Sequence, residues 1–167
     1  SDGSGTTTLL GLLAGMRPGY GGTVTIAGVT LRDLDPTSLR DAIGLHFGTN
    51  DIFEGTVEDN IGLRRDGIGP AEVMRALEAV GAAEDVQALP LGLRTPLVGA
   101  GRGLKSTLRI RLLIARAIVG APRLVLFDDA LATIEPAARH DLIAALTRRD
   151  APWTLVIVSH DPEVFQA

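Results

Sequence analysis

Two adjacent carboxylates, Asp128 and Asp129, are the side chains in this sequence best placed to do chemistry. They follow an apolar run, Leu124 to Phe127, which is too short for an ordinary helix and typical of a strand covered on both faces. Carboxylates at the carboxyl end of a buried parallel strand lie where open α/β sheets bind ligands. The pair therefore predicts a ligand-binding or active site.

A glycine-rich stretch near the start of the chain is the second candidate. It consists of Gly3, Ser4, Gly5, Thr6, Thr7 and Thr8, directly before an apolar helix. Backbone N–H groups at such a helix start can hold phosphate. The phosphate-binding P-loop pattern is G-x-x-x-x-G-K-[ST], so Thr6 stands at the lysine position and Thr7 at the hydroxyl position. An ordinary Gly/Ser turn at a helix start is the alternative.

A third candidate is His160, which follows the apolar run from Trp153 to Val158. Its position after a second predicted strand resembles that of the two aspartates, although an ordinary turn histidine is the alternative. His46 and His140 are interpreted as surface or packing residues.

Hydrophobic periodicity predicts the elements that carry these candidates. Leu108, Leu112, Ala115 and Ile118 recur at three- and four-residue steps, which predicts a half-buried helix. By similar arguments we expect helices over 6–15, 36–43, 70–80, 106–118 and 136–149, and strands over 23–26, 29–31, 44–47, 124–127 and 153–158.

Composition limits the class of protein. The chain has 167 residues, 46% of them hydrophobic, which suits one domain with a sizeable core. A net charge of −4 argues against a nucleic-acid partner, and the absence of cysteine excludes disulfides and thiolate metal sites. No apolar run approaches the roughly 20 residues of a membrane-spanning helix.

The order of the motifs resembles the nucleotide-binding domain of ATP-binding-cassette (ABC) transporters. In that family a signature loop, L-S-G-G-Q, opens a helix ending in A-L-A-R-A-L, and the following strand continues into L-D-E-A-T-S-A-L-D-P. The same frame here runs without insertion from Leu104 through Ile118 and Phe127 to Pro136. The segment from Phe53 to Ile61 resembles the exporter motif F-S-G-T-[IV]-x-x-N-I, and His160 stands at the switch-histidine position.

The resemblance implies an α/β fold with a P-loop NTPase-like core, a mainly parallel sheet and an inserted helical subdomain. We expect one cassette over 1–167, with the α/β core at 1–55 and 117–167 and the helical subdomain at 56–116. The family's first strands and its adenine-stacking aromatic residue would precede Ser1.

The resemblance also assigns roles to single residues. Thr7 and Asp128 would ligate Mg²⁺, and Asp129 stands in for the glutamate that polarises water, with a carboxylate about 1.5 Å shorter in reach. Thr6 in place of lysine removes a contact to the β- and γ-phosphates of ATP worth about 1.5–3 kcal/mol. Gly48 stands where the family's glutamine links metal and water to the membrane domain.

The signature loop departs furthest from the family pattern. The residues of the loop here are Leu104, Lys105, Ser106, Thr107 and Leu108. Ser106 and Thr107 are predicted to cap the helix. Side chains would then occupy the space in which bare backbone approaches the γ-phosphate of the partner's nucleotide.

Three functions follow from these observations. The first is the ATPase domain of an ABC exporter, which would bind MgATP between two such domains on the cytoplasmic face of the cell membrane and drive a membrane domain. The second is a degenerate cassette that keeps the fold and serves as a dimerisation or regulatory module. The third is a soluble P-loop enzyme of another class.

Overall fold

A computed structural model describes residues 5–17, 19–26, 28–47, 51–131 and 134–165. At its centre lies a parallel sheet of β3 (Ile43–Phe47), β6 (Leu124–Asp128) and β7 (Thr154–Val158), in the spatial order β3-β6-β7. Asp128 is paired with Phe47 on one side and Val158 on the other, so the three strands end together. The expected parallel sheet is confirmed.

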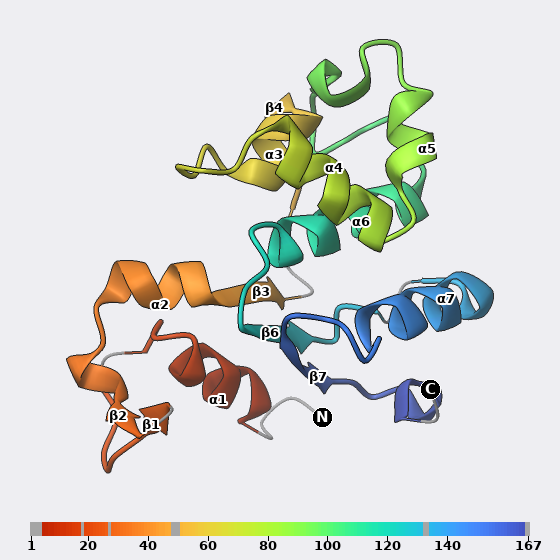
Figure 1. The fold of residues 1–167 in the computed structure, drawn as a ribbon. Helices are drawn as coiled ribbons and strands as arrows, with labels where there is room; N and C mark the ends of the chain where they lie inside the picture. The colour runs from red at the N-terminus through yellow and green to blue at the C-terminus, as the bar shows by residue number, and fades with distance from the viewer. Residues whose placement is uncertain (1–4, 18, 27, 48–50, 132–133, 166–167) are drawn as a thin grey trace.

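The two faces of the sheet bury different helices (Figure 1). Leu124 and Leu126 point to the face covered by α1 (Thr6–Leu13), where Leu10 and Ala14 pack on them. Val125 and Phe127, which alternate with them, belong to the larger core on the opposite face. This alternation places Asp128 on the α1 face, in line with Leu126.

The larger core is built around α6 (Ser106–Ile118), whose bounds match the helix predicted from the sequence. The helix lies so close to β3 that a Cβ atom at Gly44 would stand 1.9 Å from the Ala117 carbonyl oxygen. Glycine at position 44 therefore permits the contact between helix and sheet. Beyond α6 lie α3 (Val57–Gly62), α4 (Pro70–Ala79), α5 (Ala83–Gln87) and η2 (Gly92–Arg94).

One short pair of strands in this helical part was not predicted. β4 (Gly55–Thr56) pairs antiparallel with β5 (Pro96–Leu97), and Thr56 also caps α3. Two-residue strands leave no periodicity in a sequence. The pairing joins the segment before α3 to the segment after η2.

The remaining elements flank the sheet. The expected hairpin is β1 (Thr25–Ile26) with β2 (Val29–Thr30), followed by η1 (Leu31–Asp33) and α2 (Pro36–Ala42). Asp35 caps α2 as predicted, accepting a hydrogen bond from the Ser38 N–H at 2.8 Å. α7 is shorter than predicted and spans Pro136–Leu146, and η3 (Pro162–Phe165) follows β7. Across the described residues, no helix has the length and apolar character needed to cross a membrane.

Candidate functional site

The structure brings together two residues that lie 121 positions apart in the sequence. The hydroxyl of Thr7, in the first turn of α1, donates a hydrogen bond to Oδ2 of Asp128 at the end of β6. Thr7 is exposed and Asp128 is half-buried. A hydroxyl and a carboxylate side by side form an all-oxygen donor pair.

These donors fit a magnesium ion. Mg²⁺ prefers oxygen ligands and is usually held by one or two protein groups together with water and substrate phosphates. Thr7 and Asp128 supply two such groups, and the exposure of Thr7 leaves space for the other ligands. No group of three or more His, Cys, Asp or Glu side chains that could hold a metal ion occurs in the described ranges.

Asp129 begins the turn after β6 in a conformation that side chains rarely adopt. Its φ is 51°, in the left-handed region, and its N–H donates to the Val158 carbonyl oxygen at 2.9 Å. This bond extends the β6–β7 pairing by one residue. The chain turns at Asp129, whose side chain is exposed. Asp128 and Asp129 therefore differ in environment although they are neighbours.

His160 lies two residues beyond the end of β7 and is exposed. The residues before and after it, Ser159 and Asp161, both make polar contacts. The Ser159 hydroxyl accepts a hydrogen bond from the Asp161 N–H at 3.1 Å, and the Asp161 carboxylate forms an ion pair with the buried Arg139 of α7. Because β6 and β7 end side by side, His160 and Asp129 follow neighbouring strand ends.

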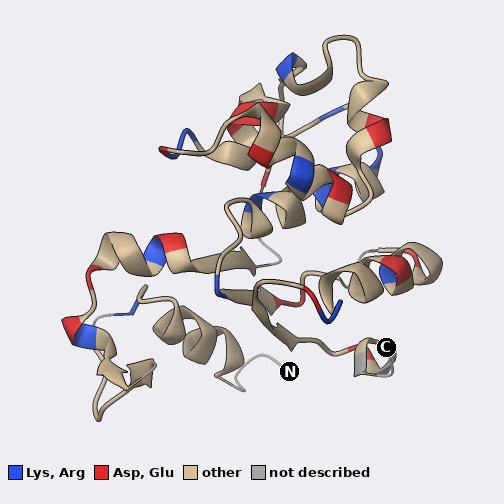
Figure 2. Cartoon of the chain, in the orientation of Figure 1, with Lys and Arg blue, Asp and Glu red and all other residues tan. Residues whose placement is uncertain are grey.

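No side chain caps the first N–H groups of α1, and no residue of this helix is charged. Its N-cap, Gly5, has a φ of 75° and no side chain to occupy the first N–H groups. Figure 2 shows α1 without a charged residue, since Thr6, Thr7 and Thr8 are followed by Leu and Gly only. Gly3, Ser4 and Gly48 lie outside the described residues. The described part of the loop thus offers backbone N–H groups and hydroxyls to an anion, but no cation.

The signature-loop residues lie at the start of α6, whose helix packs on the sheet face opposite to α1. Lys105 is the N-cap and is exposed, while Leu108 is buried in the larger core. The prediction that Ser106 and Thr107 cap the helix is wrong, because they occupy its first turn and no side chain bonds to the N-terminal amides. The loop and Thr7 belong to separate surfaces of the chain.

A buried polar network, which we call the Asn60–Arg116 network, holds the segment before α3 against α6. The Asn60 side chain is fully buried and bonds to Phe53 N–H (3.0 Å), Phe53 C=O (2.9 Å) and Thr56 C=O (3.0 Å). The Arg116 guanidinium donates to Asn60 Oδ1 at 2.9 Å, to Asn60 C=O at 2.6 Å and to Asp51 C=O at 3.1 Å. It also lies over the Phe53 ring, 5.3 Å from the centroid.

His46 lies on the face of β3 that packs against α6 and is 3% exposed, which confirms it as a packing residue. Its ring meets Phe127 edge to face at 6.1 Å, and its Nδ1 has no hydrogen-bond partner among the described residues. Burial, aided by the positive charge of Arg116, lowers the pKa of His46 from 6.5 to about 4. His46 is therefore neutral at physiological pH.

Sequence reasoning missed the role of Arg116, although a signal was present. Arg116 stands four residues after Leu112 and eight after Leu108, on the row that faces the core. A charged residue in an apolar row is buried only when it is hydrogen-bonded. The capping box formed by Thr56 and Asp59 has the spacing T-x-x-D and could have been found in the same way.

Comparison with known proteins gives consistent matches. The sequence profile of the family described as ABC transporter matches residues 1–132. YknV of Bacillus subtilis, named an uncharacterized ABC transporter ATP-binding protein, is 33% identical over 158 residues, which are 95% of this chain and 26% of that protein. IrtB of Mycolicibacterium thermoresistibile, named a mycobactin import ATP-binding/permease protein, is 34% identical over 95% of this chain and 27% of its own length.

A solved structure agrees with these sequence matches. A bacterial Atm1-family ABC exporter with ATP bound superposes with a TM-score of 0.88 at 27% identity, covering 99% of this chain and 29% of that chain. The chain therefore spans between a quarter and a third of the length of these relatives.

Proposed function

Since the chain belongs to the ABC transporter family, we propose that it is the nucleotide-binding domain of an exporter and that it binds MgATP weakly and hydrolyses it near background. The family match removes the reason to consider an unrelated P-loop enzyme. The domain would keep the cassette fold and its assembly surfaces while having lost most of its own catalytic capacity.

One observation carries this proposal. The two residues that we propose as metal ligands lie in contact, since the Thr7 hydroxyl meets the Asp128 carboxylate at the end of β6, whereas Thr6 stands where the family places its phosphate-binding lysine. A lysine there would place a full charge on the phosphates. The remaining phosphate contacts would be backbone N–H groups and the weak dipole of a helix eight residues long.

The remaining site residues take the roles that the family resemblance implies. Asp129 would orient water less effectively than a glutamate because its side chain is one methylene shorter. His160, following the neighbouring strand, would be the switch histidine. Gly3, Ser4, Gly5 and Thr8 would contribute to the phosphate loop.

We propose two partners. The signature loop at the start of α6, Leu104 to Leu108, would face the nucleotide of a second nucleotide-binding domain, although Lys105 and the bulk of Ser106 and Thr107 would hinder its closure. A membrane domain, in the same polypeptide or the same complex, would contact the chain near Gly48 at the cytoplasmic face of the membrane. If the chain divides into an α/β core (1–55 and 117–167) and a helical subdomain (56–116), the two partners would contact different parts. The second nucleotide-binding domain would contact the helical subdomain, and the membrane domain would contact the core.

Phosphate release by stepwise repaired variants tests this function. We expect the wild-type chain and Asp129→Glu to release phosphate at background rate, because neither has the lysine. A variant carrying Thr6→Lys, Asp129→Glu, Lys105→Ser, Ser106→Gly and Thr107→Gly should turn over, because both halves of the dimer site are repaired and Leu108 keeps its place in the core. Steady phosphate release by the wild-type chain, absent from Asp128→Asn, would show instead a competent ATPase.

A further inference from the structure

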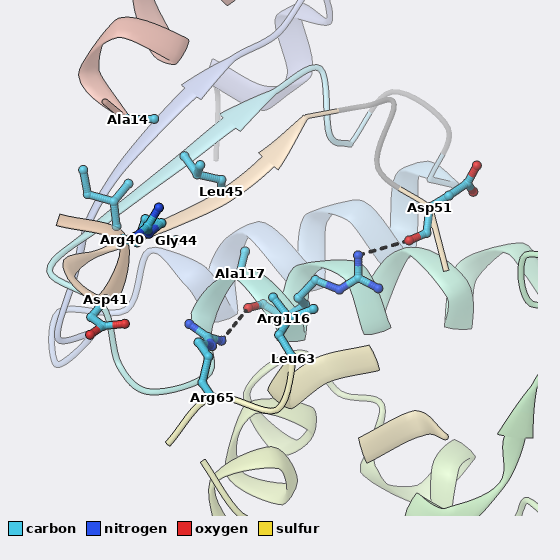
Figure 3. Close-up of a pocket in the computed structure, with 11 residues that line it drawn as sticks. Ala14, Arg40, Asp41, Gly44, Leu45, Asp51, Leu63, Arg65, Arg116 and Ala117 are labelled. Atoms are coloured by element: carbon cyan, nitrogen blue, oxygen red, sulfur yellow. Dashed lines mark hydrogen bonds between the residues drawn. The ribbon is translucent and has the colours of Figure 1, made fainter. Parts of the chain in front are cut away.

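Two clefts in the described part of the chain differ in their lining. The larger, about 480 Å³, lies beside β3 and is lined by the charged side chains of Arg40, Arg65 and Arg116 (Figure 3). The smaller, about 380 Å³, lies between α4, the turn after α6 and the residue before β7, Trp153. We call it the Trp153 cleft. Its volume is in the range of small-molecule sites.

The side chains that line the Trp153 cleft are mostly apolar. Ile118 and Val119, at the end of α6, are buried, and Ile68 is half-buried. On α4 the lining residues include Ala76 and Ala79, which lie one turn apart on the same side of the helix. Their short side chains leave room between α4 and the other walls.

The charged and polar side chains at this cleft already have partners. The Glu72 carboxylate accepts hydrogen bonds from the Gly69 N–H and from Arg75, both at 2.9 Å. The Trp153 Nε1–H donates to the Leu146 carbonyl oxygen at 3.0 Å, so its indole ring offers an apolar surface. An ion that entered would therefore meet no unpaired side chain of opposite charge among the described residues that line the cleft.

This combination of apolar walls and paired charges determines which ligand fits. A neutral apolar molecule would remove apolar surface from water and leave no charge without a partner. A flat ring would also gain contact with the Trp153 indole. A charged molecule of the same shape would lose its hydration without compensation. A polypeptide segment would bury backbone N–H and C=O groups for which this lining supplies few partners.

We propose that the Trp153 cleft binds a small neutral molecule that carries an aromatic ring. The site goes beyond the proposed function, because Trp153 precedes the amino end of β7, whereas Thr7 and Asp128 meet at the carboxyl end of β6. The bound ring would contact both α4 and Trp153. Since the cleft exists only in the folded chain, binding stabilises that chain against unfolding.

Titration with three probes of equal shape and different charge tests the inference. The probes are 2-phenylethanol, phenylacetate and 2-phenylethylammonium, and no nucleotide is present. Trp153 is the only tryptophan of the chain, so its fluorescence reports binding at the cleft. We expect 2-phenylethanol to bind at least about tenfold more tightly than either ion. It should also raise the urea midpoint of unfolding.

A cavity-filling variant locates the binding. Ala79→Leu places a larger side chain in the cleft from α4 and should weaken the binding of 2-phenylethanol at least about tenfold. Ala71→Leu is the matched control, because it makes the same change at an exposed position of the same helix outside the cleft. Both changes keep a good helix former. The control should bind 2-phenylethanol like the wild-type chain.

A second variant tests the charge argument without filling the cleft. Arg75→Gln removes a cation whose side chain is 71% exposed and leaves the Glu72 carboxylate without its ion pair. Binding of 2-phenylethylammonium should become at least about threefold tighter, whereas binding of 2-phenylethanol should stay the same. This variant decides the question if circular dichroism shows that Ala79→Leu does not fold.

Several results would overturn the inference. These are equal binding of the three probes, tighter binding of an ion than of 2-phenylethanol by the wild-type chain, or binding of none. Equal losses in Ala79→Leu and Ala71→Leu would place the binding elsewhere, and unchanged binding of all three probes by Arg75→Gln would refute the charge argument. All these outcomes are independent of whether the chain binds or hydrolyses MgATP.

Discussion

The Asn60–Arg116 network and the strand-end site of Thr7, Asp128, Asp129 and His160 use polar groups in opposite ways. In the network the Asn60 amide uses both hydrogens and its oxygen on Phe53, Thr56 and Arg116. At the strand ends, Thr7, Asp129 and His160 are exposed. The first arrangement stabilises the fold, whereas the second leaves polar groups available to a ligand.

The structure distinguishes two polar residues, Asn60 and Asp128, that the sequence alone does not rank by burial. Asn60 and Asp128 both fall in motifs shared with the family, yet only Asn60 is fully buried with its side chain saturated by internal bonds. A buried group that loses its partners costs about 1–3 kcal/mol, whereas an exposed group returns to water. Substitutions in the two regions should therefore affect different measurements.

Removal of the Asn60 side chain is expected to have the largest effect. Asn60→Ala would remove the bonds that the buried Asn60 side chain makes with Phe53 N–H, with two carbonyl oxygens and with one arm of Arg116, which should lower the free energy of unfolding by about 4 kcal/mol. Urea unfolding followed by circular dichroism measures this loss. A loss below about 1 kcal/mol would mean that the network does not hold the segment to α6.

The pH dependence of stability tests the burial of His46. Its pKa of about 4 in the folded state is below the 6.5 of the unfolded state, so the unfolded chain binds more protons between these values. The free energy of unfolding should consequently fall as the pH drops from 6.5 to 4, by about 3 kcal/mol. His46→Leu should remove this fall.

The control for His46 is His140→Leu, which changes an exposed residue of α7 and should keep the wild-type pH curve. Asp59, whose pKa is lowered to about 2 by hydrogen bonds from Thr56 and Arg64, affects stability mainly below about pH 5. The two effects are therefore separate above about pH 5, where only His46 contributes. Parallel curves for wild-type and His46→Leu would contradict the burial of the neutral ring.

Thr7→Val should have the smallest effect on stability and a clear effect on metal-dependent binding. Because Thr7 is exposed, we expect the free energy of unfolding to change by less than about 0.5 kcal/mol. In a Thr6→Lys background, Thr7→Val should weaken MgATP binding about tenfold and leave ATP binding without Mg²⁺ unchanged. Equal losses with and without Mg²⁺ would exclude Thr7 as a metal ligand.

The parts of the fold that were predictable are those with strong periodicity. The helix at Ser106–Ile118 and the strand at Leu124–Asp128 follow from runs of apolar residues with clear stops. The β4–β5 pair was not predictable, because its strands have two residues each and their partners lie about 40 residues apart in the sequence. α7 ends at Leu146, three residues before the predicted end at residue 149.

The candidate site was predictable as a set of residues but not as an arrangement. The sequence gives no sign that Thr7 meets Asp128, since that contact depends on which face of β6 carries α1. A cleft beside β3 that is lined by Arg40, Arg65 and Arg116 was equally hidden, because these residues come from three distant segments. Both depend on tertiary packing, which periodicity alone does not specify.

Calorimetric titration of the wild-type chain and Thr6→Lys with MgATP tests the central claim most directly. If Thr6 is the main cause of weak nucleotide binding, Thr6→Lys should bind MgATP about ten- to a hundredfold more tightly than the wild-type chain. Wild-type binding in the low micromolar range, unchanged by Thr6→Lys, would contradict the account.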